Sequence, residues 1–294
     1  MSSTDLTHFE LLNFEEARPM LLGLAYRILG SRADAEDAVQ DTFLKWQAAD
    51  RQAIDTPRAW LTTICTRRCL DLLGNAHRAR VDYVGAWLPE PMPTPAVSDT
   101  ERTVVLADSL STAFLLLLER LSPKERAAYL LHEIFDTPYA EIAAMLELKE
   151  SACRKLVARA RTNLQSVEQR HAPPRERQQD LLEAFRLAIT EGVTARLANL
   201  LSADIRLSAD GGGKVPTLLE PLHGQGEVLA FLANQLHEYW ADYEWRETDI
   251  NGARGLLMHQ LGSVVAVVTF GFDSAGQATD IFIVRNPDKL ARLR

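Results

Sequence analysis

The chain has 294 residues, a formal net charge of −8, 47% hydrophobic residues and 24% charged residues. This length and composition fit a globular protein of two or three domains and argue against a basic nucleic-acid coat protein. No apolar run approaches the roughly 18 residues of a membrane-spanning helix, and residues 1–10 are polar and acidic. We therefore expect a cytoplasmic protein with no signal peptide and no membrane contact.

The three cysteines, Cys65, Cys69 and Cys153, form no C-x-x-C pair. Cys65 and Cys69 lie four residues apart near His77, but a fourth metal ligand is missing. We expect buried thiols, without a disulfide framework, structural metal or cofactor.

Two helices are predicted in the first fifty residues. Apolar residues recur at helical spacing over 14–29 and end at Gly30. Ser31 with Asp34 three positions later is a capping-box pattern that predicts the start of a second helix. One face of that helix is acidic, and by itself an acidic face is typical of a solvated surface near a helix N-terminus.

A third helix is predicted to start at Thr56-Pro57, where a cap residue precedes a proline suited to the first helical position. This helix combines one tryptophan with several arginines, a mixture that could follow a phosphate backbone and stack an unpaired base. The residues are Arg58, Trp60, Arg67, Arg68, Arg78 and Arg80.

The segment that follows, residues 82–106, lacks helical periodicity and is a predicted linker. Alternate positions carry Pro89, Pro91, Pro93 and Pro95, which favours an extended path over a flexible coil. Its aromatic residues, at positions 83 and 87, need apolar surroundings. We therefore expect the linker to be docked on another part of the chain.

Four helices are predicted after this linker. The first covers 107–121, and Ser122-Pro123 with Glu125 caps the second. Thr137-Pro138 is expected to cap a short third helix that ends at 146, and a break at 147–149 precedes the fourth. The last two helices form a predicted helix-turn-helix.

The second helix of this pair carries a basic stripe. Residues 149–164 contain five basic residues and one acidic residue, a local charge of +4. A solvated helix face and a DNA-binding helix explain such a stripe about equally well when it is considered alone. In a chain of net charge −8, DNA affinity must come from such a patch, completed by a partner.

The C-terminal part belongs to another structural class. Residues 167–178, with Pro173-Pro174, form a second predicted linker. Helices are expected at 181–189, 194–201 and 227–240, and strands at 205–208, 243–248, 255–260, 263–270 and 278–285. This order predicts an α+β cone with a meandering antiparallel sheet.

Two features of the cone could indicate catalysis or phosphate binding. Asp210, His223, Asp242 and His259 are acid-base candidates, but no spacing forces two of them together, so we do not expect an enzyme. The loop Asp210, Gly211, Gly212, Gly213, Lys214 is glycine-rich, yet its lysine lacks the following Ser or Thr of a phosphate-binding loop.

Three stretches give the chain a specific resemblance. SRADAEDAVQDTFLKWQAA, TPRAWLTTICTRRCLDLL and LSPKERAAYLLHEIFDTPYAEIAAMLELKESACRKLVARARTNL resemble regions 2 and 4 of the extracytoplasmic-function (ECF) sigma factors, over 14–164. WLPEP, DGGGK and NPDKL resemble motifs of the ECF group with a fused SnoaL-like C-terminal domain, a relative of the nuclear-transport-factor-2 fold. The implied multidomain organisation is region 2 (1–81), linker (82–106), region 4 (107–166), linker (167–178) and an α+β SnoaL-like cone (179–294).

The resemblance implies three intermolecular sites. Core RNA polymerase, through its β′ and β subunits, would be the partner, with β′ bound by Asp34, Glu36, Asp37, Gln40, Asp41, Phe43 and Trp46. The −10 promoter element would be bound by Arg58, Trp60, Arg67, Arg68 and Arg78, and the −35 element by Lys149, Ser151, Arg154, Lys155, Arg159 and Arg161. Many relatives have a serine-type cap where this chain has Lys149, and Ser151 is the possible cap here.

The resemblance also implies an intramolecular site. Contacts between the cone and regions 2 and 4 would involve Trp87, Leu88, Pro89, Glu90 and Pro91, the loop 210–214, and Asn286, Pro287, Asp288, Lys289 and Leu290. We therefore expect a sigma factor that directs core polymerase to specific promoters and carries its own regulator in place of an anti-sigma factor. A two-component repressor, and an enzyme or ligand-sensing cone attached to a DNA-binding module, remain as alternatives.

Overall fold

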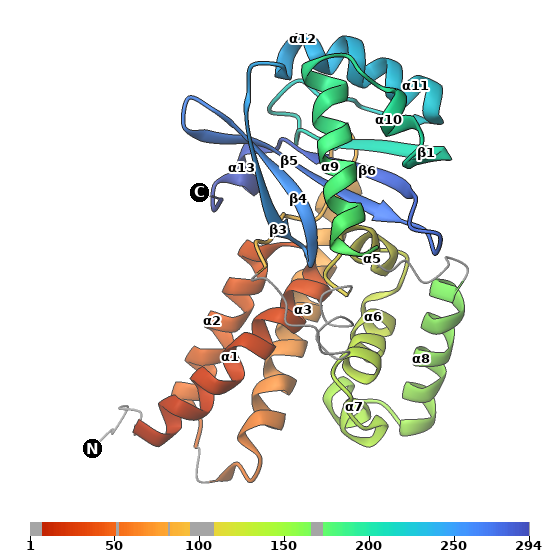
Figure 1. The fold of residues 1–294 in the computed structure, drawn as a ribbon. Coiled ribbons are helices and arrows are strands. Elements are labelled where there is room, and N and C mark those ends of the chain that lie inside the picture. The colour runs from red at the N-terminus through yellow and green to blue at the C-terminus, as the bar shows by residue number, and fades with distance from the viewer. Residues whose placement is uncertain (1–7, 51–52, 82, 95–108, 166–172, 294) are drawn as a thin grey trace. The chain divides into compact units, whose positions relative to one another are not determined.

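The computed structural model describes residues 8–50, 53–81, 83–94, 109–165 and 173–293 (Figure 1). The chain divides into two compact units, one of residues 1–81 and 118–164 and the other of residues 82–117 and 165–294. Among the described helices, none is long and apolar enough to cross a membrane.

The first unit begins with three mutually packed helices, α1 (His8–Leu29), α2 (Arg32–Ala48) and α3 (Pro57–Val81). Gly30 ends α1 with a φ of 67°, and the Ser31 hydroxyl accepts a hydrogen bond from the Asp34 amide at 3.2 Å. The predicted starts of α2 and α3 are therefore confirmed. Their core is apolar and includes Leu21, Leu24 and Leu61, which are fully buried.

The same unit contains α6 (Pro123–Tyr129), the π-helical turn η2 (Leu130–Ile134), α7 (Tyr139–Leu146) and α8 (Glu150–Gln165). The predicted capping box is present, because Glu125 accepts hydrogen bonds from the Ser122 hydroxyl at 2.6 Å and the Ser122 amide at 3.0 Å. Glu147 ends α7 in the left-handed conformation, with a φ of 55°.

Two predicted caps are wrong by one or two positions. Pro138, rather than Thr137, occupies the N-cap of α7, so the proline precedes the first helical residue. Ser151 lies inside the first turn of α8, and the Lys149 carbonyl accepts the amides of Ala152 and Cys153 at 2.9 and 3.1 Å.

The second unit is built on one six-stranded sheet of order β2-β1-β6-β5-β4-β3. The predicted antiparallel meander is confirmed in β3 to β6, whereas β1 pairs parallel to β6. The strands are β1 (Leu201–Asp210), β2 (Leu222–His223), β3 (Glu244–Ile250), β4 (Ala253–Gln260), β5 (Ser263–Phe272) and β6 (Ala278–Val284).

In the described part of this unit, seven helical elements accompany the sheet. They are α5 (Thr112–Leu118), α9 (Arg175–Thr190), α10 (Ala195–Ala198), α11 (Gln225–Ala230), the π-helical η3 (Phe231–Leu236), α12 (His237–Trp240) and α13 (Pro287–Leu290). The helix expected over 194–201 is shorter because Leu201 begins β1. The helix expected over 107–121 is described only as α5, and 107–108 lie outside the described residues.

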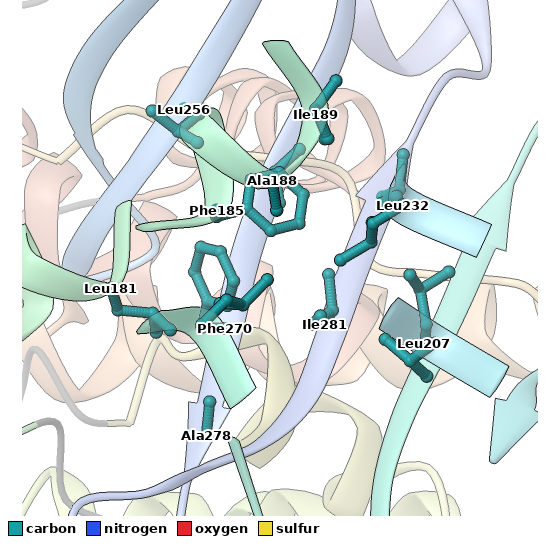
Figure 2. Packing of buried hydrophobic residues seen from close by; sticks show 14 of the residues in the cluster. Leu181, Phe185, Ala188, Ile189, Leu207, Leu232, Leu256, Phe270, Ala278 and Ile281 are labelled. Carbon is teal, nitrogen blue, oxygen red and sulfur yellow. The ribbon is translucent and has the colours of Figure 1, made fainter. Parts of the chain in front are cut away.

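Different segments cover the two faces of the sheet. On one face, α9 packs over β5 and β6, with Phe185 against Phe270 at 5.4 Å between ring centroids and Ile281 close by (Figure 2). On the other, the sheet side chains pack against the linker residue Leu88, Ala113 and Leu116 of α5, and Leu290 and Leu293 at the C-terminus. The cone therefore buries parts of the chain that precede it in the sequence by many residues.

Candidate functional site

Helix α8 presents the predicted basic surface. Its opposite face is buried through Cys153, Val157 and Ala160, each 0% exposed, which orients the polar residues towards solvent. All six predicted −35 residues are exposed: Lys149, Ser151, Arg154, Lys155, Arg159 and Arg161.

The cations of this surface are not equivalent. Arg154 is paired with Glu150 at 2.6 Å and lies 4.4 Å from the centre of the Tyr139 ring. Arg159 contacts Glu125 at 3.0 Å, and Arg161 contacts Glu133 at 2.6 Å. Among the described residues, Lys149 and Lys155 have no ion-pair partner. The two lysines are therefore the cations most readily available to a phosphate.

A pocket of about 540 Å³ lies between the end of α2 and the start of α3. Trp60 lines it and packs on Trp46, with 5.6 Å between the ring centroids. Its polar lining residues are Asp50, Asp55, Thr56 and Thr63. The pocket therefore combines an aromatic ring with hydrogen-bonding groups, as a site for an unstacked base would require.

The arginines predicted for the −10 element have different surroundings. Arg58 is exposed, and Arg68 is paired with Asp41 at 2.6 Å. Arg67 donates to the Met145 carbonyl at 3.0 Å, at the C-terminal end of α7, and contacts Glu147 at 3.1 Å. The side chain of Arg78 lies outside the described residues.

The polymerase-binding residues predicted on α2 differ in accessibility. Asp37 and Gln40 are exposed, and Asp34, Glu36, Asp41 and Phe43 are half-buried. Glu36, Gln40 and Phe43 line a groove of about 620 Å³ along α1 and α2. Trp46 is 1% exposed, so its side chain supports the helix from within and cannot reach a partner in this structure.

The three motifs WLPEP, DGGGK and NPDKL meet around one buried carboxylate. Asp210 is 0% exposed and receives the Leu88 amide at 2.9 Å, the Tyr83 hydroxyl at 2.6 Å and the Lys289 ammonium at 2.7 Å. Lys289 also donates to the Leu88 carbonyl at 2.5 Å. A single ion pair thus fixes the linker backbone through both its N–H and its C=O.

Aromatic rings complete this cluster. The Lys289 ammonium lies 4.6 Å from the centre of the Trp87 ring and 5.1 Å from that of Tyr83. Burial and the adjacent Asp210 carboxylate raise the pKa of Tyr83 well above its ordinary value. Tyr83 belongs to this cluster, whereas the sequence indicated it only as an aromatic side chain in need of burial.

The glycine-rich loop allows the close approach of NPDKL. Gly212 has a φ of 62°, and a Cβ atom there would lie 2.6 Å from Cγ of Asn286. Asn286 donates to the Tyr83 hydroxyl at 2.8 Å and caps α13 by accepting the Asp288 amide at 3.1 Å. Lys214 pairs with Asp288, on an exposed part of the loop.

The remaining motif residues are also placed. Pro89, Glu90, Pro91 and Leu290 are buried, Trp87 is half-buried and Pro287 is exposed. Glu90 lies 3.7 Å from the guanidinium of Arg292.

A second contact between linker and cone was not predicted. The Met92 amide donates to the Asn251 side chain at 2.7 Å, and the Asn251 amide returns a bond to the Met92 carbonyl at 2.9 Å. Thr94 donates to the Asp249 carbonyl at 3.0 Å, and Pro93 lies opposite Ile250 in antiparallel pairing. The linker therefore pairs with the end of the edge strand β3.

The acid-base candidates lie on separate elements. Asp210 is committed to Lys289, Tyr83 and Leu88 at the end of β1. His223 and Asp242 are exposed, and His259 lies on β4 opposite Glu244. Cys65, Cys69 and Cys153 are buried free thiols. The described part of the chain contains no cluster of three or more potential metal ligands.

Family models match both helical regions. Residues 14–79 match sigma-70 region 2, and residues 111–164 match sigma-70 region 4. The fold and these matches define a sigma-70-type transcription factor.

Similar proteins indicate a narrower class of sigma factor. The chain is 36% identical over 232 residues to the ECF RNA polymerase sigma factor SigJ of Mycobacterium tuberculosis, covering 78% of this chain and 74% of SigJ. It is 34% identical over 242 residues to the probable ECF sigma factor SigI of the same species, covering 74% of this chain and 83% of SigI. The crystal structure of M. tuberculosis SigJ matches with a TM-score of 0.74 and 30% identity, over 96% of this chain and 98% of that chain.

The chain belongs to the extracytoplasmic-function sigma factors. As such it directs RNA polymerase to promoters for transcription initiation, and the predicted fold class of helical regions 2 and 4 followed by a sheet-containing domain is confirmed. The family is non-enzymatic, and these relatives give no support to the enzyme or ligand-sensor alternative.

Proposed function

We propose that the C-terminal cone regulates this sigma factor by binding the chain that joins its two DNA-binding regions. The observation that carries the proposal is the buried Asp210–Lys289 pair, which binds both backbone groups of Leu88. Leu88 lies only a few residues after α3, the helix proposed to bind the −10 element. A domain attached in this way acts at a high effective concentration, so it needs no separate anti-sigma protein.

Each of the three intermolecular sites would bind a different partner during promoter recognition. Asp37 and Gln40 on α2 are exposed and would bind the β′ subunit of core polymerase, whose β subunit is also an expected partner, in the cytoplasm where transcription occurs. Arg58 and the Trp60 pocket would take an unstacked base of the −10 element. Helix α8 would enter the major groove at the −35 element.

The salt dependence of DNA binding tests the proposed role of α8. Each phosphate contact contributes a slope of about −0.9 in log K against log salt. Replacing Lys155 by alanine should make this slope less steep by the contribution of about one phosphate contact. The reason is that the Lys155 ammonium has no acidic partner among the described residues and is available to a phosphate. Arg161→Ala should change the slope less, because Glu133 already compensates that charge. The measurement is promoter affinity of the holoenzyme across a salt series, and equal slopes for wild type and Lys155→Ala would exclude this phosphate contact.

Regulation by the cone is tested in the full chain and in a truncated one. The double variant Asp210→Asn with Lys289→Met removes the ion pair without leaving a lone buried charge, and should loosen the linker from the cone. Promoter-dependent transcription is measured with core polymerase for wild type, the double variant and a chain lacking 176–294. We expect both variants to differ from wild type, whereas Lys214→Met, which removes only an exposed pair, should not. Unchanged transcription in both variants would exclude regulation by the cone.

A further inference from the structure

The first helix of region 4 lies on the cone. The region 4 match begins at residue 111 and so includes α5, yet residues 112–117 belong to the same compact unit as the cone, and the rest of region 4 belongs to the other unit. The family boundary and the structural boundary therefore disagree over this one helix.

The contact between α5 and the sheet is specific. The hydroxyl groups of Thr112 and Thr269 are hydrogen-bonded at 3.0 Å, and the two residues are only 5% and 8% exposed. Ala113, 5% exposed, lies over Gly271, where an added Cβ atom would stand 3.3 Å from the Ala113 Cβ. A small residue on each side thus lets the helix approach the strand closely.

The same sheet face also binds the linker. Leu88 and Ala113 belong to one buried apolar cluster, together with Ile250, Leu257, Val267 and Phe282 of the sheet. The cone therefore contacts the chain soon after region 2 ends at α3 and again at the start of region 4. Only residues 119–122 separate α5 from α6. Four residues reach at most about 15 Å, so the position of α5 limits where the helix-turn-helix can go.

We propose that α5 is a docking helix, through which the cone restrains the −35-binding part of region 4 until α5 leaves the sheet. This inference rests on the proposed regulation by the cone and names the contact that transmits it. The occupant of this sheet face is thus a segment of the chain itself, bound by the Thr112–Thr269 hydrogen bond and by the Ala113–Gly271 approach.

An engineered disulfide tests the proposal in the full-length protein. The hydroxyl groups of Thr112 and Thr269 are in hydrogen-bonding contact, so cysteines at both positions are close enough to be joined. We expect Thr112→Cys with Thr269→Cys to cross-link under mild oxidation and to lose most promoter-dependent transcription with core polymerase. Reduction should restore it. The two single-cysteine variants and the wild type, treated identically, control for the buried native thiols.

A second variant acts in the opposite direction. Ala113→Leu places a larger side chain against Gly271, and should displace α5 and increase transcription at equal protein concentration without changing any residue of the cone. Hydrogen exchange of the α5 amides should show the corresponding loss of protection.

The outcomes separate this inference from the broader proposal. A double-cysteine protein that does not cross-link would show that α5 does not occupy the sheet in solution. A cross-linked protein as active as its reduced form would show that transcription needs no release of α5. Either result overturns the docking role, whereas regulation by the cone would still stand if deletion of 176–294 changes transcription.

Discussion

Two interfaces in this protein join segments that are distant in sequence, and they are built differently. In the first unit, regions 2 and 4 meet through arginines that bind the carbonyl ends of helices. Arg126 donates to the Ile28 carbonyl at 2.7 Å, and Arg67 to the Met145 carbonyl at 3.0 Å. In the second unit, linker and cone meet through a fully buried carboxylate, an ammonium and an apolar cluster.

Accessible and buried contacts in these interfaces should differ in how readily they open. Helix C-termini attract cations, but water can replace such contacts when the side chain is accessible, and the Arg67 side chain is 43% exposed. A buried carboxylate has no such replacement. We therefore expect the Arg67 contact to open more readily than the linker leaves Asp210.

Two arginines of the first interface, Arg27 and Arg126, are buried. Arg27 donates to the Gly23 carbonyl at 2.8 Å and lies 5.6 Å from the centre of the Phe135 ring. Burial lowers the pKa of Arg27 to about 10, so the guanidinium remains charged at neutral pH. This contact between α1 and the end of η2 therefore persists over the physiological pH range.

The largest effect is expected when the linker–cone interface loses its cation. Lys289→Met leaves the buried Asp210 without its ion-pair partner, which should cost about 3–5 kcal/mol of unfolding free energy. Chemical denaturation measures the loss. Lys214→Met is the matched control and should cost no more than about 1 kcal/mol, because its pair with Asp288 is exposed. Equal losses in the two variants would contradict the assignment of Asp210 as the centre of the interface.

A smaller effect is expected at the buried arginine between regions 2 and 4. Arg126→Met removes the charged hydrogen bonds to Ile28 and to Glu119, the latter at 2.7 Å, and should cost about 2–3 kcal/mol. Denaturation of the full chain is the measurement, with Arg159→Met, whose side chain is 65% exposed, as control. A cost below that of the control would show that this interface is not occupied in solution.

Tyr83 should make the stability of the folded protein depend on pH in the alkaline range. Burial and Asp210 raise the pKa of Tyr83 in the folded protein, so the phenol contributes stability that is present below about pH 10, the ordinary tyrosine pKa, and is lost as pH rises above it. Tyr83→Phe should remove about 1–2 kcal/mol at neutral pH and flatten the alkaline decline. Stability measured from pH 8 to 11 tests this, with the exposed Tyr239→Phe as control. An unchanged alkaline decline in Tyr83→Phe would refute it.

The smallest change in stability is expected at Arg67. Arg67→Ala should cost less than about 1 kcal/mol, since the guanidinium is exposed and its contacts are with Glu147 and helix-end carbonyls. If Arg67 also binds the −10 element, transcription should fall although stability hardly changes. Transcription and denaturation of the same preparation separate the two roles. A destabilisation as large as that of Arg126→Met would contradict the expectation that the exposed Arg67 contributes less to the free energy of unfolding than the buried Arg126.

Local structure could be predicted from the sequence where the signal lies within one or two helical turns. The caps at Ser31 and Ser122 depend on groups three positions away, and both were found as expected. The strands of the meander were predicted because alternation and turn residues mark each of them. The helix-turn-helix and its basic surface followed from the same short-range patterns, although two caps were misplaced.

For the candidate binding sites, the sequence predicted which residues are involved but not their ion-pair partners or their burial. The basic stripe of α8 was evident, but two of its arginines are paired with residues of other helical elements: Glu125 lies in the first turn of α6, and Glu133 lies within η2. Within the basic stripe of residues 149–164, Lys149 and Lys155 are therefore the cations that have no ionic partner among the described residues. Trp46 shows the opposite case, because its helical position was correctly predicted while its burial against Trp60 was not.

The sequence by itself determined most of the helices and strands, the family resemblance and the motifs of the linker and cone. Only the tertiary structure decided that Asp210 binds Leu88, 122 residues earlier, and Lys289, 79 residues later. It also decided that α5 packs on the cone rather than with the helices that follow it. Local propensities act over a few residues, whereas these contacts depend on how apolar surfaces from distant segments are buried together, which no short pattern encodes.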